Sequence, residues 1–227
     1  MIPIADICKE AKKRNIITII DGCQGAANIK VDVQEIGCDF YVFSGHKLYG
    51  PSGIGVLYGK NEILSEMSPY QTGGEMIDYV SIQESTFSKI PNKFEAGTPN
   101  IVGAIGLGAA IDFVKKIGIE KLYKHNLSLT QYGLSTLESL EGIKIIGKPK
   151  NRIGIISFLL DKIHPQDLSF LLDSKGFSLR SGHHCAQPTM RYFKVETTIR
   201  ASIGIYNSEN DFDELVSALR SIKNYFN

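Results

Sequence analysis

The 227-residue sequence lacks an excess charge of either sign and any long apolar run. Its 25 Lys and Arg residues almost balance its 24 Asp and Glu residues, which leaves a formal net charge of +1. This balance gives no electrostatic reason to expect binding to nucleic acid or to an anionic membrane surface. Apolar runs such as Ile16 to Ile20 and Ile153 to Leu160 are far shorter than the roughly 20 residues that span a bilayer. We therefore expect neither a nucleic-acid partner nor a membrane segment.

Signals for secretion, disulfides and structural zinc are also missing. The first 15 residues carry charges at helical spacing and no apolar segment with a small-residue cleavage site, which predicts a cytoplasmic protein. Only four cysteines occur, Cys8, Cys23, Cys38 and Cys185, and they are far apart with no CxxC pair. This pattern argues against a disulfide framework and a zinc ribbon. We interpret the first three as structural, although Cys23 is close to Asp21 and could line a pocket.

The composition is that of a globular chain, with 43% hydrophobic and 22% charged residues. Apolar positions from Ile4 to Ala11 predict a helix, and β-branched or aromatic runs predict buried strands at 16–20, 40–43 and 53–58. Polar residues follow these strands, as is typical of an open α/β sheet. Residues 66–100 contain few periodic apolar runs and predict a long loop region.

The second half of the sequence predicts an α+β unit. Helical periodicity returns at Ile101, and a second helix is expected from Ile119 to about Leu140. The expected strands after it are 143–146, 153–160, 177–180 and 199–205, and the expected helices are 165–174 and 209–225. We place a domain boundary near 115–118, which gives domains of residues 1–115 and 116–227.

Two charged residues follow predicted buried strands of the first domain. Asp21 ends the first strand, and Lys47 follows the second in the string Ser44-Gly45-His46-Lys47. Open α/β sheets bind ligands at the carboxyl ends of their strands. Partial burial would suit Lys47 to Schiff-base chemistry, and a nearby acid would suit a pyridinium nitrogen, as in pyridoxal phosphate sites. The alternative is that Asp21 caps a helix and Lys47 is a solvated loop residue.

A cysteine lies beside two histidines in the string Arg180-Ser181-Gly182-His183-His184-Cys185-Ala186-Gln187-Pro188. A helix is expected to start at Pro188, and a helix amino terminus and nearby histidines both favour a thiolate. Zinc binding is a weaker interpretation, because the other histidines show no ligand spacing. A buried turn with an inert thiol is the third possibility.

Arg200 lies in the predicted strand 199–205, where alternation places it on the face opposite Ile199 and Ala201. An arginine between apolar neighbours needs an anion, and its planar guanidinium matches a carboxylate. The alternative is a structural salt bridge.

Four strings occur in this chain in the order found in one family: Asp21 to Gln24, Phe40 to Pro51, Phe94 to Asn100 and Arg180 to Pro188. The chain resembles a SUF-type (group II) cysteine desulfurase, from the class V aminotransferase branch of fold-type I pyridoxal-phosphate enzymes. The most specific element is RSGHHCAQP. The resemblance implies that residues 1–115 are the carboxyl-terminal part of the cofactor-binding large domain and residues 116–227 the small α+β domain. It also implies that the family's amino-terminal half lies outside this truncated chain.

The resemblance implies a role for each matching residue. Lys47 would hold the pyridoxal phosphate covalently, Asp21 would keep its pyridine nitrogen protonated and Gln24 would contact the ring hydroxyl. Ser44 and His46 would bind the phosphate, and Thr98 would bind the phosphate of a partner subunit, which implies a homodimer. Arg200 would bind the substrate carboxylate with Arg180 in support, and Cys185 would accept the sulfur. Asn100 receives no role.

The implied activity is the conversion of L-cysteine to L-alanine with a persulfide on Cys185, which would pass to a sulfur-acceptor protein of the SUF system for iron–sulfur cluster assembly. One alternative is another class V enzyme: an aminotransferase, an epimerase or a selenocysteine lyase. These would share Lys47 and Asp21 without needing the thiol. The other is an inactive fragment whose exposed sheet edge serves only for association.

Overall fold

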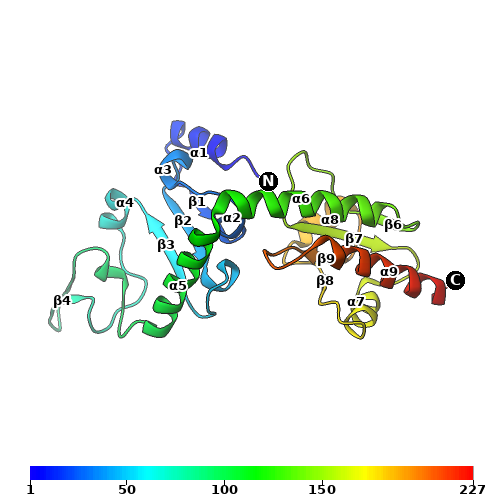
Figure 1. The fold of residues 1–227 in the computed structure, drawn as a ribbon. Coiled ribbons are helices and arrows are strands. Elements are labelled where there is room, and N and C mark those ends of the chain that lie inside the picture. Colours follow the sequence, from blue (N-terminus) through cyan, green and yellow to red (C-terminus); the bar gives the residue numbers. More distant parts are fainter. Residues whose placement is uncertain (227) are drawn as a thin grey trace. The chain divides into compact units, whose positions relative to one another are not determined.

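The computed structural model describes residues 1–226, which form two compact units (Figure 1). One unit is Ile2–Ile119, and the other runs from Glu120 onward and includes Met1. No helix within residues 1–226 combines the length and apolar character needed to cross a membrane. The assignment of residues 1–115 and 116–227 to a cofactor-binding domain and a small domain stays a prediction.

The first unit is built on a three-stranded sheet with β2 in the centre. The order is β1-β2-β3, with β1 (Ile19–Asp21) parallel to β2 (Phe40–Ser44) and β3 (Gly55–Gly59) antiparallel to it. The helices that accompany these strands are α1 (Ile4–Lys13), α2 (Cys23–Asn28), α3 (Val33–Ile36) and α4 (Asn61–Glu66). Three of these helices, α2, α3 and α4, are short and were not predicted.

The prediction of a buried strand at 16–20 was wrong in both extent and burial. The strand begins only at Ile19, and Ile16, Ile17 and Ile19 are 56%, 59% and 69% exposed. Strand β3 also exposes Val56 and Leu57. The physical reason is position, because β1 and β3 are the two edge strands. The central strand β2 buries Phe40 and Tyr41, as the sequence predicted.

Residues 66–100 contain more order than the predicted loop. Strands β4 (Ile77–Val80) and β5 (Ser85–Phe87) form an antiparallel hairpin, and the short 3-10 helix η2 (Asn92–Phe94) follows. At the hairpin turn the Ser81 hydroxyl accepts hydrogen bonds from the backbone amides of Gln83 and Glu84. Such short, exposed strands carry no apolar alternation long enough to be recognised.

Helix α5 (Ile101–Ile117) begins at a capping residue. The Asn100 side chain accepts a hydrogen bond of 2.9 Å from the Gly103 amide and donates one of 3.1 Å to the Gly53 carbonyl. Asparagine is among the preferred residues at this position, because its side chain satisfies an amide that the helix leaves free. Asn100 therefore has a structural role.

The second unit contains a four-stranded antiparallel sheet of order β6-β7-β9-β8. The strands are β6 (Ile143–Ile145), β7 (Ile155–Leu160), β8 (Arg180–Gly182) and β9 (Thr198–Ser202), and the helices are α6 (Ile119–Glu138), α7 (Pro165–Asp173), α8 (Gln187–Phe193) and α9 (Glu209–Phe226). The predicted strand 177–180 was wrong. Pairing starts only where Arg180 meets Arg200, and Phe177 and Leu179 instead pack against the core.

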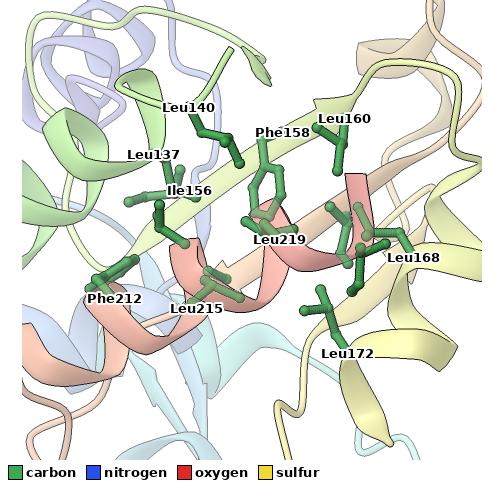
Figure 2. Close-up of a cluster of buried hydrophobic side chains, with 14 of the residues drawn as sticks. Leu137, Leu140, Ile156, Phe158, Leu160, Leu168, Leu172, Phe212, Leu215 and Leu219 are labelled. Atoms are coloured by element: carbon green, nitrogen blue, oxygen red, sulfur yellow. The ribbon is translucent and has the colours of Figure 1, made fainter. Parts of the chain in front are cut away.

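The core of this unit lies between one face of the sheet and helices α6, α7 and α9 (Figure 2). Alternation along β7 directs Ile156, Phe158 and Leu160 into the core, where they are at most 2% exposed. Leu137, Leu168 and Leu219 meet them from the three helices. Burial of each such side chain contributes about 1.5–3 kcal/mol. Because side chains alternate along β9, a core-facing Ile199 leaves Arg200 on the opposite face.

Candidate active site

The first set of candidate residues lies at the carboxyl edge of the parallel pair β1 and β2. Asp21 is the last residue of β1 and pairs with Val42, and Ser44 is the last residue of β2. The 3-10 helix η1 (Gly45–Leu48) follows Ser44 directly and carries Lys47. Parallel strands end at the same edge, so this topology brings Asp21 and the Ser44 to Lys47 segment together, as the sequence predicted.

Asp21 is an exposed carboxylate that is held in its ionised form. Its Oδ1 accepts a hydrogen bond of 3.1 Å from the Cys23 amide at the start of α2. This bond lowers the pKa of Asp21, and the positive charge of Lys47 contributes in the same direction. The helix-capping alternative is thus partly observed. The carboxylate nevertheless stays accessible to a ligand at the sheet edge.

Tyr41 fixes the turn that follows Asp21, and sequence reasoning missed this role. Its buried hydroxyl donates a hydrogen bond of 3.2 Å to the Gly22 carbonyl. Burial raises the pKa of Tyr41 to about 12, so the phenol keeps its proton at neutral pH. A Cβ at residue 22 would lie 1.8 Å from the ring, which explains the glycine. The contact between Tyr41 and Gly22 depends on the strand register that pairs Ile20 with Tyr41.

Hydroxyl, imidazole and amine groups follow one another after β2. Ser44 Oγ lies 2.7 Å from His46 Nδ1. Lys47 is exposed, so the partial burial expected from its position is not observed, and within residues 1–226 its side chain forms no hydrogen bond or ion pair. Its amine is therefore available to a ligand.

Three further candidate residues lie in the first unit. Gln24 is exposed on α2, three residues after Asp21, and Thr98 is exposed between η2 and α5. The predicted roles of both stay predictions. Cys23 is half-buried, and burial raises the pKa of its thiol, with the neighbouring Asp21 adding to the effect. This thiol is therefore neutral at neutral pH.

The second set of candidate residues lies on strands β8 and β9 of the other unit. Arg180 and Arg200 are directly opposite each other in the antiparallel pair. Burial lowers the pKa of Arg200, and the charge of Arg180 lowers it further. Within residues 1–226 the buried Nε of Arg200 has no hydrogen-bond partner, and neither arginine pairs with a carboxylate. Arg200 thus forms no structural salt bridge within the described chain, and the two guanidiniums remain available to an anion.

Cys185 lies at an exposed turn beside this arginine pair. Arg180 Nη2 lies 3.7 Å from Cys185 Sγ. The turn borders an open hollow of about 520 Å³ lined by Arg180, Ser181, His183, His184, Cys185, Gln187 and Pro188. The interpretation as a buried turn was therefore wrong, because Cys185 is exposed. Helix α8 starts at Gln187, one residue before the predicted Pro188.

The two histidines before Cys185 have different surroundings. His183 is exposed, whereas His184 is half-buried and its Nε2 lies 3.1 Å from the Thr198 carbonyl and 2.9 Å from the Thr198 hydroxyl. Burial lowers the pKa of His184, and the charge of Arg200 adds to this effect. Within the described residues, no three His, Cys, Asp or Glu side chains are grouped so as to hold a metal ion.

Relatives of known name match nearly the whole chain. A "Probable cysteine desulfurase" of Halalkalibacterium halodurans is 49% identical over 224 residues, which are 99% of this chain and 55% of that protein. A protein of the same name from Staphylococcus aureus strain Mu50 is 47% identical over 92% of this chain and 51% of its own length. The chain thus spans about half the length of these curated relatives.

Solved structures of cysteine desulfurases superpose on nearly the whole chain. The cysteine desulfurase CsdA from Escherichia coli superposes with a TM-score of 0.90 at 39% identity, over 96% of this chain and 54% of that one. An apo cysteine desulfurase from Thermococcus onnurineus NA1 gives a TM-score of 0.92 at 35% identity, over 97% and 56%. The fold is therefore that of part of a fold-type I enzyme, as predicted. The family model "Aminotransferase class-V" matches residues 1–215, and the chain belongs to that family.

Proposed function

We propose that this chain carries the lysine, carboxylate, arginine and cysteine of a pyridoxal-phosphate-dependent cysteine desulfurase. The observation that carries the proposal is the exposed Cys185 thiol next to Arg180 and close to the unpartnered guanidinium of Arg200. A class V enzyme that acts without a thiol has no need for this arrangement. The names of the relatives from Halalkalibacterium halodurans and Escherichia coli support the same activity.

The donor set at the edge of β1 and β2 fits pyridoxal phosphate. Asp21, kept ionised, would bind the protonated pyridine nitrogen, and Gln24 would bind the ring hydroxyl. Ser44 and His46 offer a hydroxyl and an imidazole 2.7 Å apart, which suits a phosphate. Thr98 would bind the phosphate in a partner subunit, and a homodimer follows from that role. When bound, the cofactor supplies an electron sink for carbanion chemistry at an amino-acid α carbon.

Lys47 would hold the cofactor covalently through Nζ and then move a proton. Its exposed amine has no competing partner within residues 1–226, so it is free for both tasks. A lysine amine released by the incoming substrate is a suitable base for the α proton of L-cysteine. The short segment η1 fixes its backbone directly after β2.

The second unit would bind the substrate carboxylate and accept the sulfur. Arg200 would pair with the carboxylate, with Arg180 in support, because both guanidiniums lack an anion in the described chain. Cys185 would attack the substrate sulfur as a thiolate. The S–S bond forms as the substrate C–S bond breaks, the bonding electron pair stays with carbon, and carbon takes up a proton. L-cysteine and the Cys185 thiol thus give L-alanine and a Cys185 persulfide, with all atoms accounted for.

The persulfide would serve as a sulfur source for iron–sulfur cluster assembly through an acceptor protein of the SUF system, in the cytoplasm. The exposed position of Cys185 supports transfer to a protein acceptor, because the acceptor's own thiol has to reach the outer sulfur.

The direct test is alanine production from L-cysteine in the presence of pyridoxal phosphate and a thiol reductant. The assay should use this chain and also a chimera in which it replaces the matching 55% of the Halalkalibacterium halodurans protein. We expect alanine and sulfide in equal amounts from the chimera. Transamination without sulfide release would favour another class V activity.

A further inference from the structure

His184 joins the turn that carries Cys185 to the start of strand β9. The two residues of the contact, His184 and Thr198, are 14 positions apart in the sequence, and Thr198 is fully buried. Both His184 and Cys185 adopt left-handed backbone conformations, with φ of 55° and 59°. Such conformations are costly for residues other than glycine and persist where surrounding contacts impose them. The bond to Thr198 is such a contact.

The contact also bears on where the ring proton is. A carbonyl oxygen can only accept a hydrogen bond, so we assign the proton to Nε2, from which it can be donated to Thr198 O at 3.1 Å. The other nitrogen, Nδ1, is buried and has no hydrogen-bond partner within residues 1–226. Protonation there would bury a second N–H without an acceptor, close to the positive charges of Arg200 and Arg180. His184 is therefore a neutral hydrogen-bond donor.

The geometry of β9 links this donor to the arginine pair. Thr198 and Arg200 are two residues apart on the strand and share one face. Arg180 faces Arg200 from β8 and reaches Cys185 with Nη2 at 3.7 Å. The charged or titratable groups around the thiol are thus Arg180, Arg200, His184 and the exposed His183.

We propose that His184 is a positioning residue that holds Cys185 beside Arg180 and Arg200 through its hydrogen bond to Thr198. This inference deepens the proposed function, because it says how the sulfur-accepting thiol is kept next to the anion site. In this account His184 contributes through position and carries no charge of its own. A looser turn would leave the thiol chemically intact but separated from the guanidiniums.

The test compares how fast anionic iodoacetate and neutral iodoacetamide alkylate Cys185 in the 227-residue chain. Rates are measured on the Cys185 peptide by mass spectrometry, so the other three cysteines do not interfere. The ratio of the two rate constants reports the local positive potential, and it needs neither cofactor nor turnover. A failure of this test is therefore distinct from a failure of the desulfurase proposal.

Two amide substitutions separate position from charge. His184→Gln places an N–H close to where Nε2 lies, whereas the shorter side chain of His184→Asn ends near the position of Nδ1 and cannot reach Thr198. We expect His184→Asn to lower the iodoacetate to iodoacetamide ratio at least about threefold, and His184→Gln to keep most of it. His183→Gln, a change at the adjacent exposed histidine, should leave the ratio unchanged. Equal ratios in both His184 variants and the wild type would overturn the proposal, as would an equal loss in the Asn and Gln variants.

A second substitution covers the case in which the His184 variants do not fold, as judged by thermal unfolding. Thr198→Val keeps the carbonyl and removes the hydroxyl 2.9 Å from Nε2. It should lower the ratio by a smaller factor than His184→Asn and in the same direction. An unchanged ratio would show that the Thr198 hydroxyl does not hold the turn and would overturn its part in the proposal.

Discussion

The hydroxyl of Tyr41 donates a hydrogen bond of 3.2 Å to the carbonyl of Gly22, and its ring fills the space that a side chain at residue 22 would need. The Asp21 carboxylate directly precedes this glycine. Because Tyr41 is buried on the central strand, it fixes the turn that directs Asp21 towards the sheet edge. A core aromatic ring thus determines the geometry of a candidate cofactor ligand.

Replacement of Gly22 by alanine should destabilise the first unit. The new Cβ would lie 1.8 Å from Tyr41 Cζ, so either the ring or the turn has to move, at a cost of about 1–3 kcal/mol or more. The free energy of unfolding in urea measures this cost. The matched control is Gly108→Ala on the exposed side of α5, where a Cβ meets nothing within 4 Å. At that position alanine should raise the free energy of unfolding by about 0.5–1 kcal/mol. Equal stability of both variants would contradict the account.

Asp39 should make the stability of the first unit depend on pH. Its carboxylate accepts hydrogen bonds from the amide and hydroxyl of Thr18, at 2.8 and 2.9 Å, and from Lys60 at 2.7 Å. Burial opposes ionisation, but the bonds from Lys60 and Thr18 outweigh it and lower the pKa of Asp39. A carboxyl whose pKa is lower in the folded state stabilises the fold at neutral pH. That contribution is lost as the pH falls below about 4.

The substitution Asp39→Asn should therefore lower the free energy of unfolding by about 1–3 kcal/mol at pH 7 and by much less at pH 3. Urea unfolding at both pH values measures the difference. Asp112→Asn, at an exposed carboxylate on α5, serves as the control and should leave the pH dependence as it is in the wild type. A constant cost of Asp39→Asn at both pH values would exclude the ionised carboxylate as its source.

Lys47→Ala should remove covalent attachment of pyridoxal phosphate. Reduction with borohydride, followed by peptide mapping, identifies the modified lysine in the chain or the chimera. We expect the label on Lys47 in the wild type and in Lys89→Ala, which alters another exposed lysine of the first unit. A persistent label of equal yield in Lys47→Ala would reject Lys47 as the attachment residue.

Arg200→Lys should weaken binding of L-cysteine. Lysine keeps the charge but cannot match a carboxylate with two parallel N–H donors. We expect KM for L-cysteine to rise by about tenfold, since charge-assisted bonds to a carboxylate contribute about 1.5–3 kcal/mol. Steady-state kinetics of the chimera measure it, with Arg220→Lys on the exposed surface of α9 as the control. An unchanged KM would mean that another group binds the carboxylate.

Sequence reasoning succeeded where local pattern determines structure. The apolar run at 40–43 predicted the central strand, and the helical spacing of apolar residues after Ile101 predicted α5. It failed at edge positions, because the burial of Ile16 to Ile20 depends on neighbouring strands that periodicity cannot reveal. The hairpin of β4 and β5 was missed because its strands are short and exposed and carry no apolar alternation.

The same distinction separates the features of the candidate site that could be predicted from those that could not. The ends of β1 and β2 placed Asp21 near Lys47, because parallel strands finish at one edge. The contacts of Tyr41 with Gly22 and of His184 with Thr198 join segments 19 and 14 residues apart, and they depend on register and backbone conformation. A threonine at the head of a strand gives no indication in the sequence that a histidine will bind it.

The most direct test of the central claim is the fate of sulfur in Cys185→Ser. The wild-type chimera, incubated with pyridoxal phosphate and L-cysteine and without reductant, should carry one extra sulfur atom on the Cys185 peptide, with one L-alanine released for each persulfide. Cys185→Ser should still bind the cofactor at Lys47 but form no persulfide and release little alanine from L-cysteine, while selenocysteine remains a substrate. Undiminished alanine release from L-cysteine by Cys185→Ser would contradict the account and assign the chain to another class V activity.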